Sequence, residues 1–278
     1  MGTRLAWAFG VALVMMWVSA VNLHAGEKEE PKRPPVARYE CRPRTGAIEI
    51  DGRLDEEAWS DAPRIAVRYP SNGHAPVDPP AAFARMTWDE ASLYIGVDVD
   101  DANILAEGKG RDEAGIAPPN DVVEVFIDIA DDPHHFFELH VTPNDARNDV
   151  FVIRPEEGSS LEKRTRWGML FLKGFDLKEW PVAVRVAGTI NDDSDRDEGW
   201  TVEMELPFRS LLMPFEGTGL RKGNRQKCPD IGQTWRIQLV VQNCDLAHRY
   251  YVWSPSDNPW HHKAWARWGR VEFVGGDE

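Results

Sequence analysis

The chain has 278 residues, with 46 Asp and Glu against 32 Lys and Arg, which gives a formal net charge of −14. This length suits one or two domains, and a hydrophobic fraction of 42% can build a sizeable core. The acidic balance argues against nucleic acid or an anionic membrane surface as a partner, because both need clustered Lys and Arg. Twelve tryptophans are more than such a core usually needs, and aromatic faces are common platforms for flat ligands.

The first 25 residues have the pattern of a secretory signal peptide. Arg4 supplies a cation, Leu5–Val18 is apolar, and small residues follow. The alternative is a signal anchor, since such an apolar run can reach membrane length. Residues 26–39 are expected to form a flexible leader because they are rich in charge and proline. We therefore expect a secreted or periplasmic protein, without a membrane partner after cleavage, whose folded domain covers residues 40–278.

The rest of the chain is a series of short segments with alternating polar and apolar residues, separated by turn residues, which indicates β-strands. In chain order, we expect strands at Ala47–Asp51, Ala82–Trp88, Leu93–Val99, Val122–Ile129, Phe136–Thr142, Asp149–Ile153, Val182–Ile190, Trp200–Leu206, Trp235–Asn243, Tyr250–Trp253 and Gly269–Val274. Short helices are expected around Ala58-Trp59 and at Pro207–Leu212. This pattern predicts one all-β domain, an antiparallel, jelly-roll-like β-sandwich with one or two short helices.

Strand alternation separates a core face from an outer face. The expected core positions include Val123, Val125, Leu139 and Val141, and the outward positions on the same strands and a third one carry polar groups: Glu124, Glu138, His140, Gln238 and Gln242. Carboxylate, imidazole and amide groups can exchange directional hydrogen bonds with sugar hydroxyls, so these five residues are candidates for carbohydrate binding. The alternative is that they are ordinary solvent-facing residues.

Four tryptophans gather near the C-terminus, and one of them is a candidate binding residue. Trp260 lies in a turn-rich loop of Asn, Pro and His residues, where a core tryptophan would be awkward, so we expect it to be exposed and to stack on a sugar ring. Trp253 and Trp268 flank strands and are expected in the core.

An acidic loop is a candidate calcium site. Asp193, Asp195 and Asp197 occupy alternate positions, as oxygen-ligand loops require. A solvated acidic hairpin loop is the alternative interpretation. No organic cofactor is expected.

The cysteines and the catalytic motifs add two further expectations. In an oxidising compartment Cys228 and Cys244 are the expected disulfide pair, with Cys41 left over. Glu203 and Glu205 share a strand face and resemble a glycosidase pair, but a solvated strand face explains them as well. We therefore expect no enzyme activity.

Five segments, read in order, resemble carbohydrate-binding module family 9. They are Ile50–Trp59, Thr87–Ile95, Asn120–Asp128, Gly199–Glu203, and the stretch from Trp253-Ser254-Pro255 to Trp268–Phe273. The resemblance implies a non-catalytic β-sandwich that binds sugars, commonly with structural calcium. Such modules usually accompany xylanases or other glycoside hydrolases.

The resemblance also implies roles for single residues. Trp260 looks like one of two tryptophans that sandwich the sugar, and Glu124 matches a glutamate that contacts sugar hydroxyls. The family's second tryptophan falls at Ala117-Pro118-Pro119, which has no aromatic residue, and its pocket arginine falls at His140. The candidates for the missing aromatic wall are Trp167 and Trp180.

The sequence therefore predicts a secreted, non-catalytic protein that binds oligo- or polysaccharides, in the breakdown of polymers such as xylan or cellulose. A glycoside hydrolase is a candidate partner. Two alternatives stay open: a glycosidase-like hydrolase, and an electron-transfer sandwich with haem held by Met and His or Lys. The methionine candidates for the latter are Met86, Met169, Met204 and Met213.

Overall fold

The structure is a computed structural model that describes residues 33–73, 75–108, 110, 120–172, 174–212, 214 and 228–276. From Pro34 onward the chain forms one compact unit. The predicted signal peptide, residues 1–25, and the leader up to residue 32 lie outside the described residues, as do Ala117-Pro118-Pro119 and Met213. Within the described part of the chain, no helix combines the length and the apolar character needed to cross a membrane.

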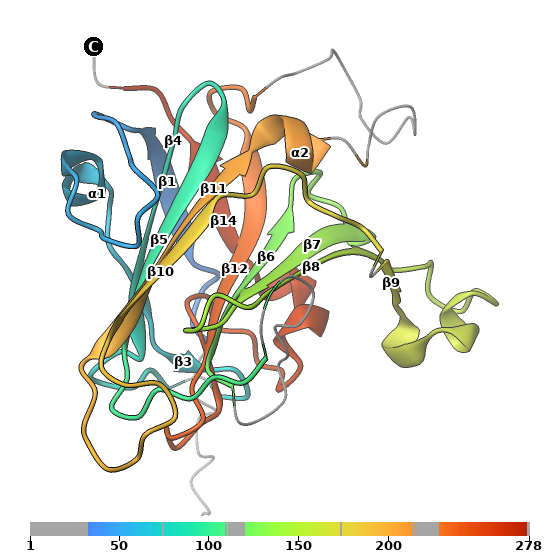
Figure 1. Ribbon diagram of the computed structural model, residues 1–278. Helices are drawn as coiled ribbons and strands as arrows, with labels where there is room; N and C mark the ends of the chain where they lie inside the picture. The colour runs from blue at the N-terminus through green and yellow to red at the C-terminus, as the bar shows by residue number, and fades with distance from the viewer. Residues whose placement is uncertain are drawn as a thin grey trace, which may run out of the picture. The chain divides into compact units, whose positions relative to one another are not determined.

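The unit consists mainly of β-strands (Figure 1). They are β1 (Arg38–Pro43), β2 (Ile65–Val67), β3 (Tyr69–Pro70), β4 (Ala82–Trp88), β5 (Ser92–Asp100), β6 (Val122–Asp128), β7 (His135–Val141), β8 (Arg147–Ile153), β9 (Leu170–Leu172), β10 (Val182–Ala187), β11 (Gly199–Pro207), β12 (Thr234–Gln242), β13 (Tyr250–Val252) and β14 (Gly269–Phe273). Two short α-helices are described, α1 (Glu57–Asp61) and α2 (Phe208–Leu212). Single 3-10 turns are η1 (Glu162–Arg164), η2 (Arg166–Gly168), η4 (His261–Lys263) and η5 (Trp265–Arg267). The predicted all-β sandwich is confirmed.

Two sheets make up the sandwich. The first has the order β10-β11-β5-β4, with β2 paired to β4, and the second has the order β14-β12-β6-β7-β8-β9, with β13 and then β3 added beside β12. All of these pairings are antiparallel, as predicted. β1 is the exception, because it runs parallel to β14 through Arg38–Cys41 and parallel to β4 through Arg42–Pro43. It thereby joins the two sheets along one strand.

The hairpin between β4 and β5 shows how local sequence sets the strand register. The carboxylate of Asp89 accepts the backbone N–H groups of Ala91 (2.8 Å) and Ser92 (2.9 Å), which closes the turn. Trp88 then pairs with Leu93 across the two strands. Asp readily forms such side-chain turns, and the alternation of apolar residues on both sides keeps the register.

The main core lies between the two sheets and contains the residues that alternation assigned to it. Val123, Val125, Leu139 and Val141 all belong to this cluster and are almost fully buried. Trp253 also packs here, as expected. The prediction of the core face is therefore confirmed for both β6 and β7.

The other face of the second sheet is covered as well, which the alternation did not predict. A smaller apolar cluster lies on it, formed by Phe126, Phe136, Val150, Val152, Met169, Val240, Val252 and Trp268. Trp268 comes from the C-terminal segment of residues 253–268, which packs over this face, and Met169 comes from the connection after β8. The expectation that the polar residues of this face are exposed to solvent is therefore wrong, although they do lie opposite the main core.

The folded unit begins earlier than the leader prediction placed it. Arg38 and Tyr39 are the first residues of β1, whereas the predicted strand at Ala47–Asp51 has no regular structure. The outward positions of β1 are charged, so the composition of its first residues resembles that of the charged, proline-rich stretch before it. Its backbone pairs with β14 over Arg38–Cys41 and with β4 over Arg42–Pro43, which fixes it in the sandwich.

The predicted disulfide between Cys228 and Cys244 is absent, and all three cysteines are free thiols. The two residues lie beyond opposite ends of β12, a strand of nine residues. At about 3.3 Å per residue such a strand is about 30 Å long, whereas a disulfide needs Cα atoms within about 7 Å.

Candidate functional site

The C-terminal segment, residues 253–268, is fixed over the polar face by hydrogen bonds from side chains to its main chain. Gln238 on β12 donates from Nε2 to the carbonyl of Ser254 (2.8 Å) and accepts the Ser254 N–H on Oε1 (3.2 Å). The hydroxyl of Ser254 donates to the carbonyl of Arg267 (2.7 Å), which closes the segment on itself. Gln238 is fully buried and acts as an anchor for this segment.

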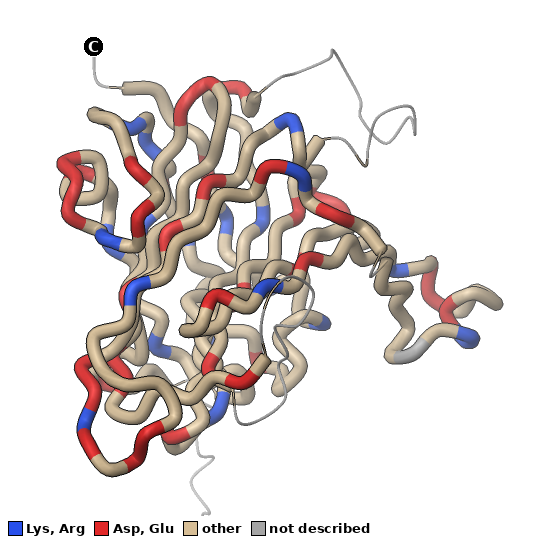
Figure 2. The backbone as a smooth tube through the Cα atoms, viewed as in Figure 1, with Lys and Arg blue, Asp and Glu red and all other residues tan. Residues whose placement is uncertain are grey.

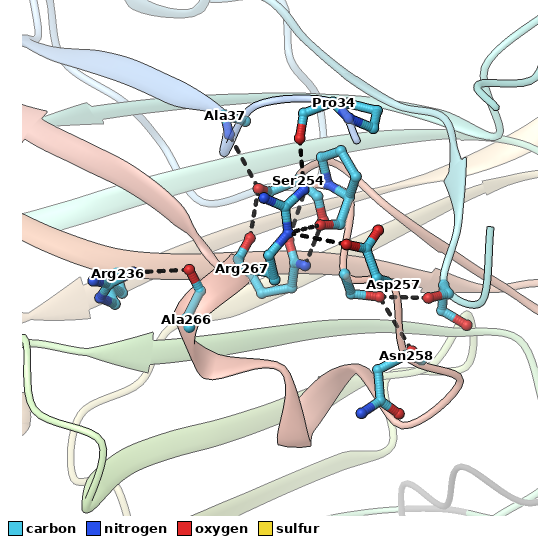
Figure 3. A network of polar contacts seen from close by, with 12 residues as sticks. Pro34, Ala37, Arg236, Ser254, Asp257, Asn258, Ala266 and Arg267 are labelled. Carbon is cyan, nitrogen blue, oxygen red and sulfur yellow. Dashed lines mark hydrogen bonds and ion pairs between the residues drawn. The ribbon is translucent and has the colours of Figure 1, made fainter. Parts of the chain in front are cut away.

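Arg267 connects the same segment to the start of the folded unit (Figure 3). Its guanidinium donates to the carbonyls of Pro255 (3.0 Å) and Pro34 (2.7 Å) and lies 3.5 Å from a carboxylate oxygen of Asp257. The N–H of Ala37 donates to the Ser254 hydroxyl (3.1 Å). The first residues of the unit and the loop that carries Trp260 therefore form one polar network.

A buried carboxylate–imidazole pair links this segment to β6. Oε2 of Glu124, on β6, is 2.8 Å from Nε2 of His261, on η4, and both side chains are almost completely buried. Burial alone would raise the pKa of Glu124, but the hydrogen-bonded His261 holds this pKa below its ordinary value. Glu124 is therefore an ionised acceptor.

His140 lies beside Glu124 on the neighbouring strand, because the two residues are direct partners in the β6–β7 register. Nε2 of His140 is 3.1 Å from Oε1 of Glu138, two residues earlier on β7, and Nδ1 is 3.3 Å from the side-chain amide of Asn148 on β8. The three predicted residues Glu124, Glu138 and His140 thus occupy one buried row rather than a free surface.

Two indoles form the exposed part of the site. Trp260 is 52% exposed, as predicted, and Trp167 on η2 is 44% exposed. Their ring centroids are 6.3 Å apart with an interplanar angle of 29°, and His262 lies within 6.2 Å of both rings. Of the two candidates for a second aromatic wall, Trp167 therefore lies beside Trp260, whereas Trp180 is buried in the main core.

The backbone of Trp167 supports this assignment. Its φ of 60° and ψ of 17° lie in the left-handed region, which a bulky residue rarely adopts. Such conformations persist only where the surroundings impose them, and they gather at functional sites. The connection that bears η1 and η2 extends away from the sheets (Figure 1), and this conformation turns its indole toward Trp260.

Buried polar atoms around the pair lack protein partners. Among the described residues, no hydrogen-bond partner exists for Oε1 of Glu124, Oε2 of Glu138, Nδ1 of His261 or Nε2 of His262. An unsatisfied buried polar group costs about 1–3 kcal/mol. A hydroxyl-rich ligand could satisfy such groups, since each hydroxyl both donates and accepts.

Burial also sets the charge state of His262. Burial, together with the neighbouring His261, lowers the pKa of this imidazole from 6.5 to about 4. His262 is therefore neutral at pH 7. Sequence reasoning did not select His261 or His262 as sugar-site residues; their only signal was adjacency to Trp260.

Gln242 has a structural contact of its own. Its side-chain amide donates to the carbonyl of Asn120 (2.5 Å), just before β6, and the residue is fully buried. The sugar-binding roles predicted for Gln238 and Gln242 stay predictions, but both amides already bind main-chain groups of this chain.

The acidic loop between β10 and β11 lies apart from the indole pair along the chain, and its charge is evident in Figure 2. Asp193 and Asp195 are exposed, whereas Asp197 is buried and accepts the backbone N–H groups of Thr189 (2.7 Å) and Ile104 (2.8 Å). In the described part of the chain, no group of three or more Asp, Glu, His or Cys residues is arranged to hold a metal ion. Calcium binding by this loop stays a prediction.

The carboxylates that suggested a hydrolase have structural partners. Glu203 is fully buried and accepts hydrogen bonds from the Trp59 indole (2.7 Å) and from the backbone of Asp51 (3.0 Å) and Gly52 (2.7 Å). Glu205 accepts a hydrogen bond from the hydroxyl of Ser92 (2.7 Å). Both therefore stabilise the first sheet and its turns.

The described methionine candidates for haem ligation lie in apolar clusters. Met86 and Met204 belong to the main core, and Met169 belongs to the smaller cluster on the second sheet. All three are at most 2% exposed.

Comparison with known proteins gives consistent matches. Residues 50–274 match the sequence model of the family described as carbohydrate family 9 binding domain-like. A carbohydrate binding module family 9 from Caldicellulosiruptor kristjanssonii in complex with cellotriose is similar over 87% of this chain and 95% of that chain, with 15% identity and a TM-score of 0.52. A module of the same family and organism in complex with glucose is similar over 86% of this chain and 97% of that chain, with 15% identity and a TM-score of 0.53. No protein of curated function matches the chain.

Proposed function

We propose a function from one premise: this chain belongs to the carbohydrate family 9 binding domain-like family. It binds a saccharide at the indole pair of Trp260 and Trp167. The observation that carries this proposal is the pair itself, two exposed indoles above a buried row of polar groups. Two adjacent exposed indoles form an apolar patch of the kind that marks a ligand site, and an indole face covers the apolar face of a pyranose ring.

The separation of the two rings defines how a sugar enters. A pyranose ring between two indoles needs each contact at about 3.5–4.0 Å, hence a separation of about 7–8 Å between the indoles. The observed centroid distance is 6.3 Å, so the rings must move apart by about 1–2 Å. Both indoles lie on connections outside the sheets, which makes this adjustment feasible without disturbing the core.

The polar row supplies the hydrogen bonds. Glu124 is an ionised acceptor, and neutral His262 presents a ring nitrogen without a protein partner among the described residues. His262 lies beside both indoles, so we expect the hydroxyls at one end of the sugar ring to approach the polar row there while the rest of the sugar chain remains in solvent. We expect a glucose- or xylose-based oligosaccharide, in line with the cellotriose and glucose bound by the two similar modules.

In this proposal the protein is secreted or periplasmic and serves polysaccharide breakdown without hydrolysing the polymer itself. The structural roles of Glu203 and Glu205 support a binding role. A glycoside hydrolase that acts on the same polymer is the expected partner. Release of reducing sugars from xylan or cellulose by the purified protein would contradict the non-catalytic part of the proposal.

The binding experiment uses Trp260→Ala and Trp167→Ala, with calorimetric titration of cellotriose and xylotriose. Truncation of a tryptophan that anchors a ligand commonly costs about 2 kcal/mol or more, a loss of affinity of roughly thirtyfold. Ile231→Ala is the matched control, since Ile231 is 71% exposed and belongs to the turn before β12.

The melting temperature separates binding from folding. Exposed residues usually change stability by about 0.5 kcal/mol or less, so all three variants should melt close to the parent protein. Unchanged affinity in both tryptophan variants would exclude the indole pair as the site. A large fall in melting temperature for Trp260→Ala would show that Trp260 is a structural residue.

A further inference from the structure

A groove away from the indole pair in its lining residues has an unusual charge for this protein. It has a volume of about 870 Å³ and is lined by β1, β14 and the segment Pro63–Tyr69. Five arginines contribute to its lining: Arg38, Arg42, Arg64, Arg68 and Arg270. The acidic residues of the lining are Glu40 and Glu272, so five arginines face two glutamates and the formal charge is +3. The whole chain, in contrast, has a formal net charge of −14.

Strand geometry places these arginines on one face. Residues 38, 40 and 42 alternate with the core residues Tyr39 and Cys41 along β1, so they share its outer face. In the parallel register of β1 and β14, Arg38 is paired with Arg270 and Glu40 with Glu272. Arg64 and Arg68 flank the core strand β2 at the same alternate spacing. The sequence therefore places arginines on both walls of the groove, with the paired Glu40 and Glu272 between Arg38 and Arg42 on the wall formed by β1 and β14.

Three of the arginines have partners. Arg42 lies 3.6 Å from Glu40, and Arg270 lies 3.6 Å from Asp131. Arg68 donates to the carbonyl of Val77 and lies 3.4 Å from Asp78. These contacts fix the position of the guanidinium groups without consuming all five donors of each.

The two remaining arginines have no such partner. Within the described part of the chain, no hydrogen bond or ion pair engages the guanidinium of Arg38 or Arg64, and both residues are exposed. The Arg64 guanidinium lies 3.3 Å from the ring centroid of Phe83, which orients it by a cation–π contact and leaves its N–H groups available. A planar guanidinium of this kind matches a carboxylate with two parallel hydrogen bonds.

We propose that this groove binds an acidic saccharide, a chain of uronate sugars whose carboxylates pair with Arg38 and Arg64. Tyr69, Trp253 and Pro255 supply the apolar part of the lining, against which sugar carbons can pack. A nucleic acid is the poorer match, because it would extend its phosphates beyond this short row onto a surface of net negative charge. The inference rests on the proposed function only in taking the ligand to be a saccharide; Trp260 and Trp167 are not part of this groove.

The test is a calorimetric titration of the full protein with trigalacturonic acid at 20 and 200 mM NaCl. The variant Arg38→Gln/Arg64→Gln removes the two unpaired charges. Arg185→Gln/Arg196→Gln removes two other exposed arginines and so has the same net charge. We expect at least tenfold weaker binding for the groove variant, parent-like binding for the control, and weaker binding of every protein at the higher salt.

Each contrary result overturns the inference. The first is equal affinity of the two double variants for trigalacturonic acid, and the second is no binding of trigalacturonic acid to the parent protein. The third is that a ten-nucleotide single-stranded DNA binds more tightly than trigalacturonic acid and that this binding also depends on Arg38 and Arg64. The proposed function fails separately. Cellotriose binding should be lost in Trp260→Ala and retained in Arg38→Gln/Arg64→Gln, whereas loss of trigalacturonic acid binding in Trp260→Ala alone would place the acidic sugar at the indole pair.

Discussion

Gln238 should matter to this protein as an anchor of the C-terminal segment. The variant Gln238→Leu keeps the approximate side-chain volume but removes both hydrogen bonds to Ser254. The N–H and the C=O of Ser254, which Gln238 holds at 3.2 and 2.8 Å, would then be left without these partners in a fully buried position. Each unsatisfied buried group costs about 1–3 kcal/mol, so the free energy of unfolding should fall by about 2–6 kcal/mol.

The assay is thermal and urea-induced unfolding of Gln238→Leu beside a matched control. For a unit of this size, 1 kcal/mol shifts the melting temperature by about 2–4 °C, so a fall of at least about 4 °C is expected. The control is Gln233→Leu. The Gln233 amide accepts only a local N–H bond from Asp230 in the turn before β12 and is half-buried, so its loss should cost about 1 kcal/mol or less.

Saccharide affinity should fall together with stability in Gln238→Leu, because the segment that Gln238 holds carries Trp260. The contrary pattern would refute this reasoning. If Gln238→Leu melts like Gln233→Leu while cellotriose binding disappears, then Gln238 contacts the sugar directly, as strand alternation had suggested, and the bonds to Ser254 have little energetic weight.

Three further predictions concern the titration of His262 and the acidic loop. Because the native His262 has a pKa of about 4 and an unfolded histidine one of 6.5, only the unfolded chain gains this proton as pH falls from 6.5 to 4. The free energy of unfolding should thus decrease by about 3 kcal/mol over that window. When this free energy is measured by urea unfolding at several pH values, it should depend less steeply on pH in His262→Asn than in the parent protein. An identical pH dependence in the two proteins would contradict the lowered pKa of His262. Asp197→Ala should lose about 2 kcal/mol because two backbone N–H groups lose their acceptor, whereas exposed Asp193→Ala should be near neutral. If the loop binds calcium, a hundredfold excess over the dissociation constant should stabilise the parent by about 2.7 kcal/mol, and identical melting with chelator and with calcium would exclude such a site.

The sequence was a good guide to the strands and to one of their two faces. Val123, Val125 and Leu139 were placed correctly because a period of two residues, once one face is known to be apolar, specifies which side chains enter the core. The exposed position of Trp260 was also predictable, since Asn, Pro and His residues around it exclude a regular core strand.

The cover over Glu124 and His140 was not predictable in this way. It consists of a segment that lies more than a hundred residues later in the chain, and no local pattern reports where such a segment returns. The same holds for Trp167, whose contact with Trp260 joins two loops that are distant in sequence. The error over Cys228 and Cys244 was avoidable, because the strand between them already implied their separation.

The parallel pairing of β1 with β14 has a mechanical consequence. These strands lie near the two ends of the folded unit, and they run in the same direction with evenly spaced hydrogen bonds. Tension applied between the ends would pull β1 and β14 in opposite directions along their lengths. The bonds of the whole ladder would then be loaded in shear at the same time, instead of opening one after another like a zipper. A protein tethered at one end while flow drags on the other would therefore resist unfolding where its two sheets join.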